Sequence, residues 1–376
     1  MTLCNNCVLD DDSVPDINFD ESGLCNYCKT FFDVISKEWF PNKIGEEKLS
    51  KILNKIREEG KKKEYDCIIG LSGGIDSSYL TLKAKDWDLR PLVVHVDAGW
   101  NSELAVSNIE KIIKYTGFDL HTEVIDWDVM RRLQLAYLKS GVSNQDVPQD
   151  HIFFSTLYKY SIKHKINYSI SGGNIATESI LPDIWHGPAM DAISLKDIFK
   201  KFGEGTLENY KTISFFQYYI WYPFINKLTT IRPLNYMPYN KEIAKNELEI
   251  IGFKNYKGKH GESLFTKFFQ EYYLPKKFKI DKRRAHLSSL ILSNQITREE
   301  ALRELEETPY NPMKIRETTE FICKKLEISQ NDFEDLLKIP NRKYEDFRNW
   351  SNRRKILTSL HSIYKNITGK KIKIYS

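Results

Sequence analysis

The clearest hydrophobic pattern in the chain is an apolar run at residues 65–71 (YDCIIGL), followed by apolar residues at helical spacing. The run has the length of a buried strand, and Ile75, Tyr79 and Leu82 then recur on one side of a helix. A few small and polar residues separate the strand-length run from the residues at helical spacing. This pattern predicts a strand, a tight turn and a helix in that order.

The same succession of apolar strand and amphipathic helix continues downstream. Further strands are predicted at residues 91–96, 120–126 and 168–171. Helices fill the intervals, and Asn101 or Ser102 is expected to cap the first of them. Strands that alternate with helices in this way indicate an α/β fold with a doubly wound, mostly parallel sheet. Ligands of such sheets bind beyond the carboxyl ends of the strands.

These patterns divide the chain into four segments. The expected boundaries are 1–30 for a cysteine-rich zinc module, 31–64 for a linker helix, 65–240 for the α/β domain and 241–376 for a helical substrate or partner region. Within the last segment, Thr297 and Ser329 are expected to open helices with a capping box.

Composition and charge change this picture little. Of the 376 residues, 41% are hydrophobic and 28% are charged, which is typical of a soluble globular protein. The formal net charge of +5 is too weak to indicate binding to nucleic acid or to a membrane. The densest apolar stretch, 215–224, is about half as long as a membrane-spanning helix and is expected to be core or partner surface. No secretory signal begins the chain, so we expect a cytoplasmic enzyme.

Four of the six cysteines lie in two Cys-x-x-Cys pairs near the start of the chain. Cys4 and Cys7 form the first pair, and Cys25 and Cys28 form the second. Each pair can direct two thiolates at one ion, and this spacing is typical of a tetrahedral zinc site. Disulfides would not persist in the reducing compartment that we expect. We therefore predict a structural Zn²⁺ site, with a redox or iron–sulfur role as the alternative.

Two Gly-Gly turns follow predicted strands. The first, Gly73 and Gly74, lets backbone N–H groups approach an anion closely. It is not a Walker A loop, because Ile75 and Asp76 stand where that loop needs Lys and then Ser or Thr. The second turn lies in SGGNIATES, residues 171–179, after the fourth predicted strand. Parallel strands end at one edge of a sheet, so we expect both turns to meet there.

Residues 72–77 (SGGIDS) resemble the SGGxDS signature of the PP-loop ATP pyrophosphatases. The resemblance implies that the loop holds the β- and γ-phosphates of ATP, that Mg²⁺ assists, and that a substrate oxygen attacks the α-phosphorus. Among the implied catalytic residues, Asp76 would support Mg²⁺, and Asn174 and Glu178 would face the α-phosphate. The implied ATP-binding residues are Ser72, Gly73, Gly74, Ser77, Ser78, His95, Val96, Asp97, Gly172, Gly173 and Thr177.

Longer stretches resemble a more specific family, the N-acetyl sugar amidotransferases of the WbpG/PseA type. The similar stretches are HVDAGWNS at 95–102, PLNYMPYNK at 233–241, the basic and aromatic segment at 255–291, and TREEAL at 297–302. Together with the N-terminal cysteines, they extend the resemblance over essentially the whole chain. The family acts in lipopolysaccharide O-antigen and nonulosonic acid biosynthesis.

This second resemblance implies a reaction. ATP adenylylates the amide oxygen of a nucleotide-linked N-acetyl sugar, and attack by ammonia then gives an acetamidino group, AMP and pyrophosphate. The resemblance implies Lys259 and His260 as catalytic residues, and Glu262, Lys282 and Arg283 as substrate-binding residues. Most other charges of the basic segment are expected to lie on a solvated helix face.

The ammonia is expected to come from another protein. A glutaminase needs a reactive cysteine, whereas Cys67 and Cys323 lack the sequence context of a nucleophile. The resemblance implies a HisH-like glutaminase subunit that supplies ammonia through a HisF-like barrel protein. We expect neither nucleic acid nor a membrane as a partner.

Two other functions remain open. A tRNA thiolation enzyme can combine a PP-loop domain with a Cys-x-x-Cys zinc module. The modest net charge argues against tight tRNA binding, and Cys67 is the only cysteine outside the zinc pairs that lies near the loop. The third alternative is a scaffold that keeps the fold without enzymatic activity.

Overall fold

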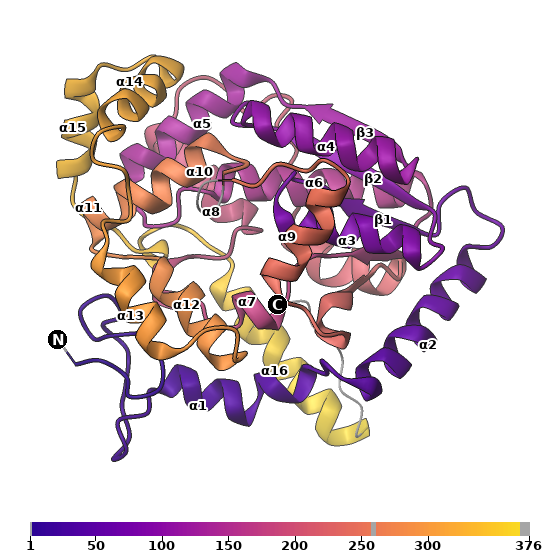
Figure 1. The fold of residues 1–376 in the computed structure, drawn as a ribbon. Helices are drawn as coiled ribbons and strands as arrows, with labels where there is room; N and C mark the ends of the chain where they lie inside the picture. Colours follow the sequence, from indigo (N-terminus) through magenta and orange to yellow (C-terminus); the bar gives the residue numbers. More distant parts are fainter. Residues whose placement is uncertain (1, 257–260, 369–376) are drawn as a thin grey trace.

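The computed structural model describes residues 2–256 and 261–368, with 361–368 described by their backbone alone. Its centre is a sheet of five parallel strands in the order β3-β2-β1-β4-β5. Figure 1 labels three of them, β1, β2 and β3. The strands are β1 (Cys67–Gly70), β2 (Pro91–Asp97), β3 (Asp119–Val124), β4 (Tyr168–Ile170) and β5 (Thr229–Ile231). The predicted α/β class with a parallel sheet is confirmed.

The strand order reverses direction at the centre of the sheet. From β1 the chain adds β2 and β3 on one side, and it later adds β4 and β5 on the other. Ile69 of β1 lies at this centre, paired in register with Val93 of β2 and Ile170 of β4. At such a switch point the loops that leave β1 and β4 diverge, and ligands of doubly wound sheets bind between them.

Alternate strand residues send their side chains into two helical layers. Ile68 and Val94 pack with one layer, and Ile69 and Val93 pack with the other. The first layer contains α5 (Trp127–Ser140), α6 (Val147–Lys163) and α8 (Ala192–Phe202). The second contains α2 (Lys43–Gly60), α3 (Ile75–Asp86), α4 (Glu103–Thr116) and α9 (Lys241–Ile250). The parallel sheet is thus covered on both faces.

The chain beyond residue 261 is mostly helical and is drawn in orange and yellow in Figure 1. Its helices are α10 (Leu264–Phe268), α11 (Leu274–Phe278), α12 (Arg283–Leu292), α13 (Arg298–Glu306), α14 (Ile315–Leu326), α15 (Gln330–Lys338) and α16 (Ser351–Thr368). The capping boxes predicted at Thr297 and Ser329 are confirmed at the starts of α13 and α15.

Short helices connect the larger elements. They are α1 (Asn26–Asp33), η1 (Ile35–Glu38), α7 (Ile175–Glu178), η2 (Asp183–Trp185), η4 (Pro233–Tyr236), η6 (Tyr344–Asp346) and the two π-helical turns η3 (Gln217–Ile225) and η5 (Phe269–Tyr273). Most of the apolar stretch at 215–224 forms η3, in which Tyr219 and Tyr222 are buried while Trp221 and Phe224 are exposed. The run therefore serves as core on one side and as surface on the other.

Some element boundaries differ from those expected. The third strand ends at Val124, because the side chain of Asp126 caps α5 by accepting from the N–H groups of Asp128 and Val129. The short strand β5 was not predicted. Helix α9, just beyond the expected boundary at residue 240, packs against α3 of the α/β domain. Within the described residues, no helix combines the length and the apolar character that a membrane span requires.

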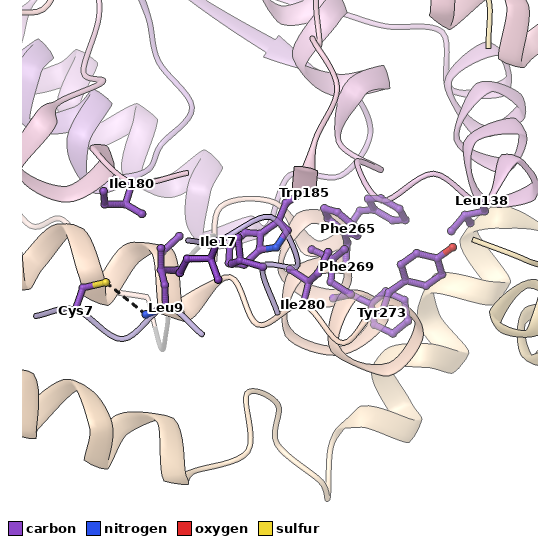
Figure 2. Close-up of a cluster of buried hydrophobic side chains, with 14 of the residues drawn as sticks. Cys7, Leu9, Ile17, Leu138, Ile180, Trp185, Phe265, Phe269, Tyr273 and Ile280 are labelled. Atoms are coloured by element: carbon purple, nitrogen blue, oxygen red, sulfur yellow. Dashed lines mark hydrogen bonds between the residues drawn. The ribbon is translucent and has the colours of Figure 1, made fainter. Parts of the chain in front are cut away.

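A second core joins the start of the chain to the C-terminal helices. Figure 2 shows Leu9 and Ile17 next to Trp185, with Phe265 and Phe269 beyond it. All five side chains are buried. Because burial of this much apolar surface is strongly favourable, the N-terminal segment is held firmly against the C-terminal helices.

Candidate functional site

The first Gly-Gly turn leaves β1 and enters α3 in a conformation that favours glycine. Gly73 has a φ of +84°, in the left-handed region. A Cβ at this position would lie 2.9 Å from the carbonyl oxygen of Ala105 in α4, so space also excludes a side chain. From the other side, the Tyr256 hydroxyl donates to the carbonyl oxygen of Gly73 at 2.7 Å. The turn is therefore fixed before any ligand binds.

Serine hydroxyls bridge the inside of this turn. The N–H of Gly74 donates to Oγ of Ser72 at 3.2 Å, and the N–H of Ser72 donates to Oγ of Ser77 at 3.3 Å. These bonds are long, and phosphate oxygens are stronger acceptors for the same N–H groups. Ser78 differs, because it is fully buried and its Oγ has no hydrogen-bond partner among the described residues.

The second Gly-Gly turn lies directly against the first turn of α3. A Cβ at Gly172 would lie 3.0 Å from the carbonyl carbon and oxygen of Asp76, so the two segments meet without room for a side chain. Asn174 caps the short helix α7 by accepting from the N–H of Thr177 at 2.9 Å. The structure thus brings together the residues predicted on both turns. Their contact with ATP stays a prediction.

Charged groups of opposite sign lie beside the second turn. A Cβ at Gly173 would lie 3.7 Å from Oε2 of Glu178 and 3.7 Å from Nε of Arg232. Arg232 follows β5 at the carboxyl edge of the sheet, and it is exposed. Its guanidinium is a positive charge next to the switch point, and guanidinium groups are well suited to bind phosphate.

A tyrosine holds Asp76 at the start of α3. The Tyr239 hydroxyl donates a short hydrogen bond to Oδ1 of Asp76. Burial raises the pKa of Tyr239 far above its usual range, and the nearby charge of Asp76 adds to the shift. Tyr239 therefore stays a neutral donor. Because a carboxylate has two oxygens with several lone pairs, Asp76 retains capacity to bind a cation such as Mg²⁺.

His95 and its neighbours lie at the carboxyl end of β2, where the sequence predicts the adenine site. The amide of Asn101 donates to Nε2 of His95 at 2.9 Å, so Nδ1 carries the proton and donates to the carbonyl oxygen of Leu71 at 2.8 Å. Burial lowers the pKa of His95 and keeps the ring neutral. Val96 is buried, and Asp97 accepts from a backbone N–H at 2.8 Å. An adenine contact stays a prediction for all three.

The C-terminal region reaches the first turn through Glu262. The N–H of Ser102 donates to the carbonyl oxygen of Glu262 at 2.9 Å, and Oγ of Ser102 donates to that of Gly261 at 2.7 Å. An antiparallel bridge extends this pairing to the neighbouring residues. The pairing directs the carboxylate of Glu262 at the turn, where Oε1 lies 3.3 Å from the position of a Cβ on Gly74.

Helix α12 holds the second turn from the same region. Oγ of Ser293 donates to the carbonyl oxygen of Ala176 at 2.7 Å. Nδ1 of His286 lies 3.0 Å from the carbonyl oxygen of Thr177. Both acceptors belong to α7, the helix that the second turn opens. The C-terminal region therefore contacts both turns of the switch point.

Two basic residues predicted to bind substrate have different surroundings. Arg283 donates to both carboxylate oxygens of Asp281 and to two carbonyl oxygens at the end of α13, at 2.9 Å each. Its guanidinium already binds the protein, and a substrate contact stays a prediction. The ammonium of Lys282 lies 5.6 Å from the ring centre of Phe269, and it makes no hydrogen bond to another described residue.

Three residues that lie at the turns were not predicted from the sequence, and two predicted residues lie outside the described part of the chain. Lys259 and His260, the predicted catalytic pair, lie outside the described residues. Tyr239, Tyr256 and Arg232 were missed. A signal existed for Arg232, because it follows a short β-branched run, where the carboxyl end of a strand is expected. Tyr239 lies in the stretch PLNYMPYNK, which carries the family resemblance.

The four N-terminal cysteines converge as the spacing predicts. The Sγ atoms of Cys4, Cys7, Cys25 and Cys28 all lie within 4.8 Å of one another, and all four residues are buried. The Cys4 and Cys28 sulfurs are 4.0 Å apart, and those of Cys7 and Cys25 are 3.7 Å apart. Four sulfurs about 2.3 Å from one tetrahedral zinc are about 3.8 Å from each other. The donor set and its spacing therefore fit Zn²⁺.

Arginines of the C-terminal region bind this cysteine cluster. Arg298 donates to the carbonyl oxygens of Cys4 at 2.9 Å and of Cys7 at 3.1 Å. Arg284 forms an ion pair with the buried carboxylate of Asp10 at 2.8 Å. These polar contacts join the cysteine cluster and its neighbour Asp10 to α12 and α13. Helix α12 is also the helix that supports the second Gly-Gly turn.

Comparison with known proteins adds a family. Residues 262–361 match the family described as the C-terminal domain of WbpG-like LPS biosynthesis proteins. The chain is similar to an NH3-dependent NAD synthetase from Campylobacter jejuni, at 19% identity and a TM-score of 0.27, over 35% of this chain and 57% of the synthetase. It is also similar to an NMN synthetase from Francisella tularensis, at 15% identity and a TM-score of 0.34, over 67% of this chain and 93% of that one.

Both TM-scores are low, and neither likeness adds to the fold that the strand order establishes. No curated protein sequence matches the chain.

Proposed function

We propose that the chain is an ATP-dependent amidotransferase, because residues 262–361 match the C-terminal domain of the WbpG-like LPS biosynthesis proteins. Its substrate is a nucleotide-activated sugar that carries an N-acetyl group. The enzyme adenylylates the amide and replaces its oxygen with nitrogen from ammonia, which gives an acetamidino group. The product is used in O-antigen or nonulosonic acid biosynthesis.

One observation carries this proposal: the WbpG-like match begins at a residue that contacts the first Gly-Gly turn, the turn that we propose binds phosphate. Glu262 is the first residue of the family match, and its carboxylate lies against Gly74. Ser293, the C-cap of α12 in the same match, donates to Ala176 of α7, the helix that follows the second turn. A domain of a lipopolysaccharide biosynthesis family thus shares one site with the nucleotide-binding edge of the sheet. An enzyme that joins ATP to a sugar requires this juxtaposition.

The first step uses the two Gly-Gly turns. The N–H groups and hydroxyls of the first turn bind the β- and γ-phosphates, and Arg232 stabilises negative charge that develops at the α-phosphate. The amide oxygen of the acceptor forms a bond to the α-phosphorus, the bond from phosphorus to the bridging oxygen breaks, and pyrophosphate leaves. The amide nitrogen releases its proton to solvent, which leaves a neutral O-adenylyl imidate. When bound at Asp76, Mg²⁺ neutralises phosphate charge.

The second step uses the electrophile that the first step creates. An amide carbon is a poor electrophile, but adenylylation turns its oxygen into a good leaving group. Ammonia forms a bond to this carbon, a proton passes from its nitrogen to the sugar nitrogen, and AMP leaves. The catalytic residues that we propose for the two steps are Asp76, Asn174, Glu178, Lys259 and His260.

The burial of the two cysteines outside the zinc cluster supports the proposal that ammonia comes from another protein. Cys67 and Cys323 are only 0% and 3% exposed. Burial raises the pKa of Cys67 well above its usual value and that of Cys323 to about 11. Neither suits a glutaminase nucleophile or a persulfide carrier, because both roles need an accessible thiolate. We propose that a HisH-like glutaminase supplies ammonia through a HisF-like barrel protein; the same burial argues against tRNA thiolation.

The zinc site has a structural role in this proposal. Four protein thiolates leave no coordination position for a substrate, so Zn²⁺ takes no part in either step. Thiolate ligands and ATP chemistry both suit a reducing compartment, and we place the reaction in the cytoplasm.

The proposal is tested with ATP, Mg²⁺, ammonium chloride and UDP-linked N-acetyl sugars. We expect AMP and pyrophosphate in equal amounts, with continued turnover only when sugar and ammonium are both present. Mass spectrometry of the sugar should show that an NH group has replaced oxygen. Formation of ADP would contradict attack at the α-phosphorus, and tRNA-dependent formation of AMP would favour the thiolase.

Two variants link this activity to the first turn. Ser72→Ala and Asp76→Ala should each reduce the rate of AMP formation by about a hundredfold, because each removes a group placed against the phosphates. The matched control is Ser329→Ala, which removes a hydroxyl at the start of α15, away from the turns. Full activity in both turn variants would show that AMP is formed at another site.

A further inference from the structure

A cluster of polar side chains lies where α6 extends beyond the end of β1. Phe153 of α6 packs on this strand so closely that a Cβ on Gly70 would lie 2.4 Å from its ring. Asp146 and Asp150 precede Phe153 by seven and three positions, which places them on the same face of the helix. Gly70 ends β1 and the phosphate-binding turn follows it, so both carboxyl groups lie at the carboxyl edge of the sheet, beside that turn.

The two carboxyl groups differ in how they are satisfied. Asp146 accepts from Oγ1 of Thr266 at 2.9 Å and from Nε2 of Gln270 at 3.4 Å. The carboxyl of Asp150 accepts no hydrogen bond from the described residues, although the residue keeps partial solvent access. Burial raises its pKa to about 7, the Asp146 charge adds to the rise, and Lys282 opposes it. A partly buried carboxyl that accepts no hydrogen bond within the protein keeps its lone pairs for water or a ligand.

Two further groups of the cluster lack hydrogen-bond partners. Nε2 of His186 is buried and has none among the described residues. Burial lowers the pKa of His186, and the charge of Lys282 lowers it further. Trp185, which precedes His186, packs in the same buried cluster as Phe269. The ammonium of Lys282 itself lies near the Phe269 ring. Asp146, one helical turn before Asp150, accepts a hydrogen bond from Gln270, which follows Phe269. The carboxyl, the imidazole and the ammonium therefore lie around one aromatic residue, and each has hydrogen-bonding capacity left.

We propose that Asp150, His186 and Lys282 form the subsite for the hydroxyl-bearing ring of the acceptor sugar. Sugar hydroxyls both donate and accept, so one can donate to the carboxylate while its neighbour accepts from the ammonium. Convergent polar groups beside an aromatic surface are typical of a small-molecule site. The inference rests on the proposed function, which supplies the sugar as the acceptor.

A short chain of contacts links this subsite to the phosphate-binding turn. Oγ of Ser263 donates to Oε1 of Gln149 at 3.2 Å, and Gln149 precedes Asp150 in α6. Ser263 follows Glu262, whose carboxylate lies against Gly74. A sugar ring bound at Asp150 therefore lies within a few residues of the phosphates, as transfer to its N-acetyl oxygen requires. Ammonium is the other ligand that two carboxylates attract, but the charge of Lys282 repels it.

The test measures binding by titration calorimetry, with UDP-N-acetylglucosamine, UDP-N-acetylgalactosamine and UDP alone as probes. Asp150→Asn and Lys282→Met should each weaken binding of at least one sugar nucleotide about tenfold, the effect of losing one charged hydrogen bond. Binding of UDP alone should change much less. Lys276→Met is the matched control, because Lys276 is exposed on α11 and should leave all affinities unchanged.

Several outcomes would overturn the inference. They are failure of both sugar nucleotides to bind the wild type, equal affinities in wild type and variants, and equal losses for the sugar nucleotides and for UDP. If the variants instead raise the concentration of ammonium chloride needed for half-maximal AMP formation while sugar binding is unchanged, the cluster is an ammonium site. Failure of the proposed function looks different, because a sugar that binds would then yield no AMP with ammonium.

Discussion

At the scale of single residues, the carboxyl of Asp150 connects the proposed subsite to stability. Its pKa is about 7 in the folded chain, whereas an unperturbed aspartate has a pKa of about 3.9. Between these two values the folded state binds a proton that the unfolded state has lost, so the free energy of unfolding falls as the pH rises through this window. The full difference corresponds to about 4 kcal/mol.

We therefore expect Asp150→Asn to remove most of this pH dependence. An amide does not titrate, so the variant should gain stability relative to wild type as the pH rises, and should be the more stable protein at pH 8. Urea unfolding followed by circular dichroism at pH 5 and pH 8 measures the effect. Asp335→Asn, a change at an exposed position of α15, is the control and should follow the wild type. If Asp150→Asn keeps the wild-type pH dependence, Asp150 is ionised in the folded protein.

Residue roles that depend on local motifs were predictable, and those that depend on tertiary contacts were not. Ser72 and Gly73 sit in a signature that is local in sequence, and the structure places them at the switch point. Tyr239 meets Asp76 across more than a hundred and sixty positions of sequence. Asp150 lies in a helix whose pattern indicates only a buried face. Such partners follow from how helices pack on the sheet, which a single sequence does not specify.

At the scale of elements, the hydroxyl of Ser102 both caps a helix and binds a neighbouring loop. Its Oγ caps α4 by accepting from the N–H of Ala105 at 3.2 Å, and it also donates to Gly261. Ser329 caps α15 in a similar way but contacts no part of the site. The two serines therefore separate the contribution of a cap to stability from the contribution of one loop to the position of Glu262.

We expect Ser102→Ala and Ser329→Ala to lower the free energy of unfolding by similar amounts, about 1 kcal/mol each. Only Ser102→Ala should slow AMP formation, by about tenfold, because it frees the backbone that directs Glu262 at the turn. Urea unfolding and the AMP assay give the two measurements. Equal activity of the two variants would mean that backbone pairing positions Glu262 without the hydroxyl.

Element type was predictable where periodicity was strong. The strands β1, β2 and β4 are apolar runs bounded by turn residues, and the sequence indicates each of them. β5 has only three residues, all partly exposed, so it carries no apolar run that marks a strand. The helix α7 has four residues and depends on Asn174 as its cap and on α12 as its support. Short elements of this kind are specified by their neighbours more than by their own sequence.

At the scale of the whole molecule, the N-terminal cysteine cluster is linked to the site through helices of the C-terminal region. The cysteine cluster binds α13 through Arg298, and Asp10 near it binds α12 through Arg284. Helix α12 in turn holds α7 and the second Gly-Gly turn through Ser293. Helix α12 thus connects the segment that carries the cysteine cluster to the switch point.

This connection predicts that metal removal impairs catalysis indirectly. Without Zn²⁺ four buried thiols lose their common ligand, and a structural zinc contributes several kcal/mol or more to folding. We expect Cys25→Ser with Cys28→Ser to lose bound zinc, to expose the amides of α12 and α13 to faster hydrogen exchange, and to slow AMP formation. The amides of α4, on the far side of the first turn, should keep their protection. Wild type should hold one zinc per chain.

The matched control is Cys323→Ala, which removes a buried cysteine of α14 that lies outside the cluster. It should keep its zinc and the exchange rates of α12, even if the cavity lowers its stability by a few kcal/mol. A metal-free wild type would contradict the zinc site itself. Another outcome is loss of zinc while hydrogen exchange in α12 and AMP formation stay at wild-type levels. In that case the arginine contacts do not make the stability of α12 depend on the zinc site. The second turn would then depend on α12 packing alone.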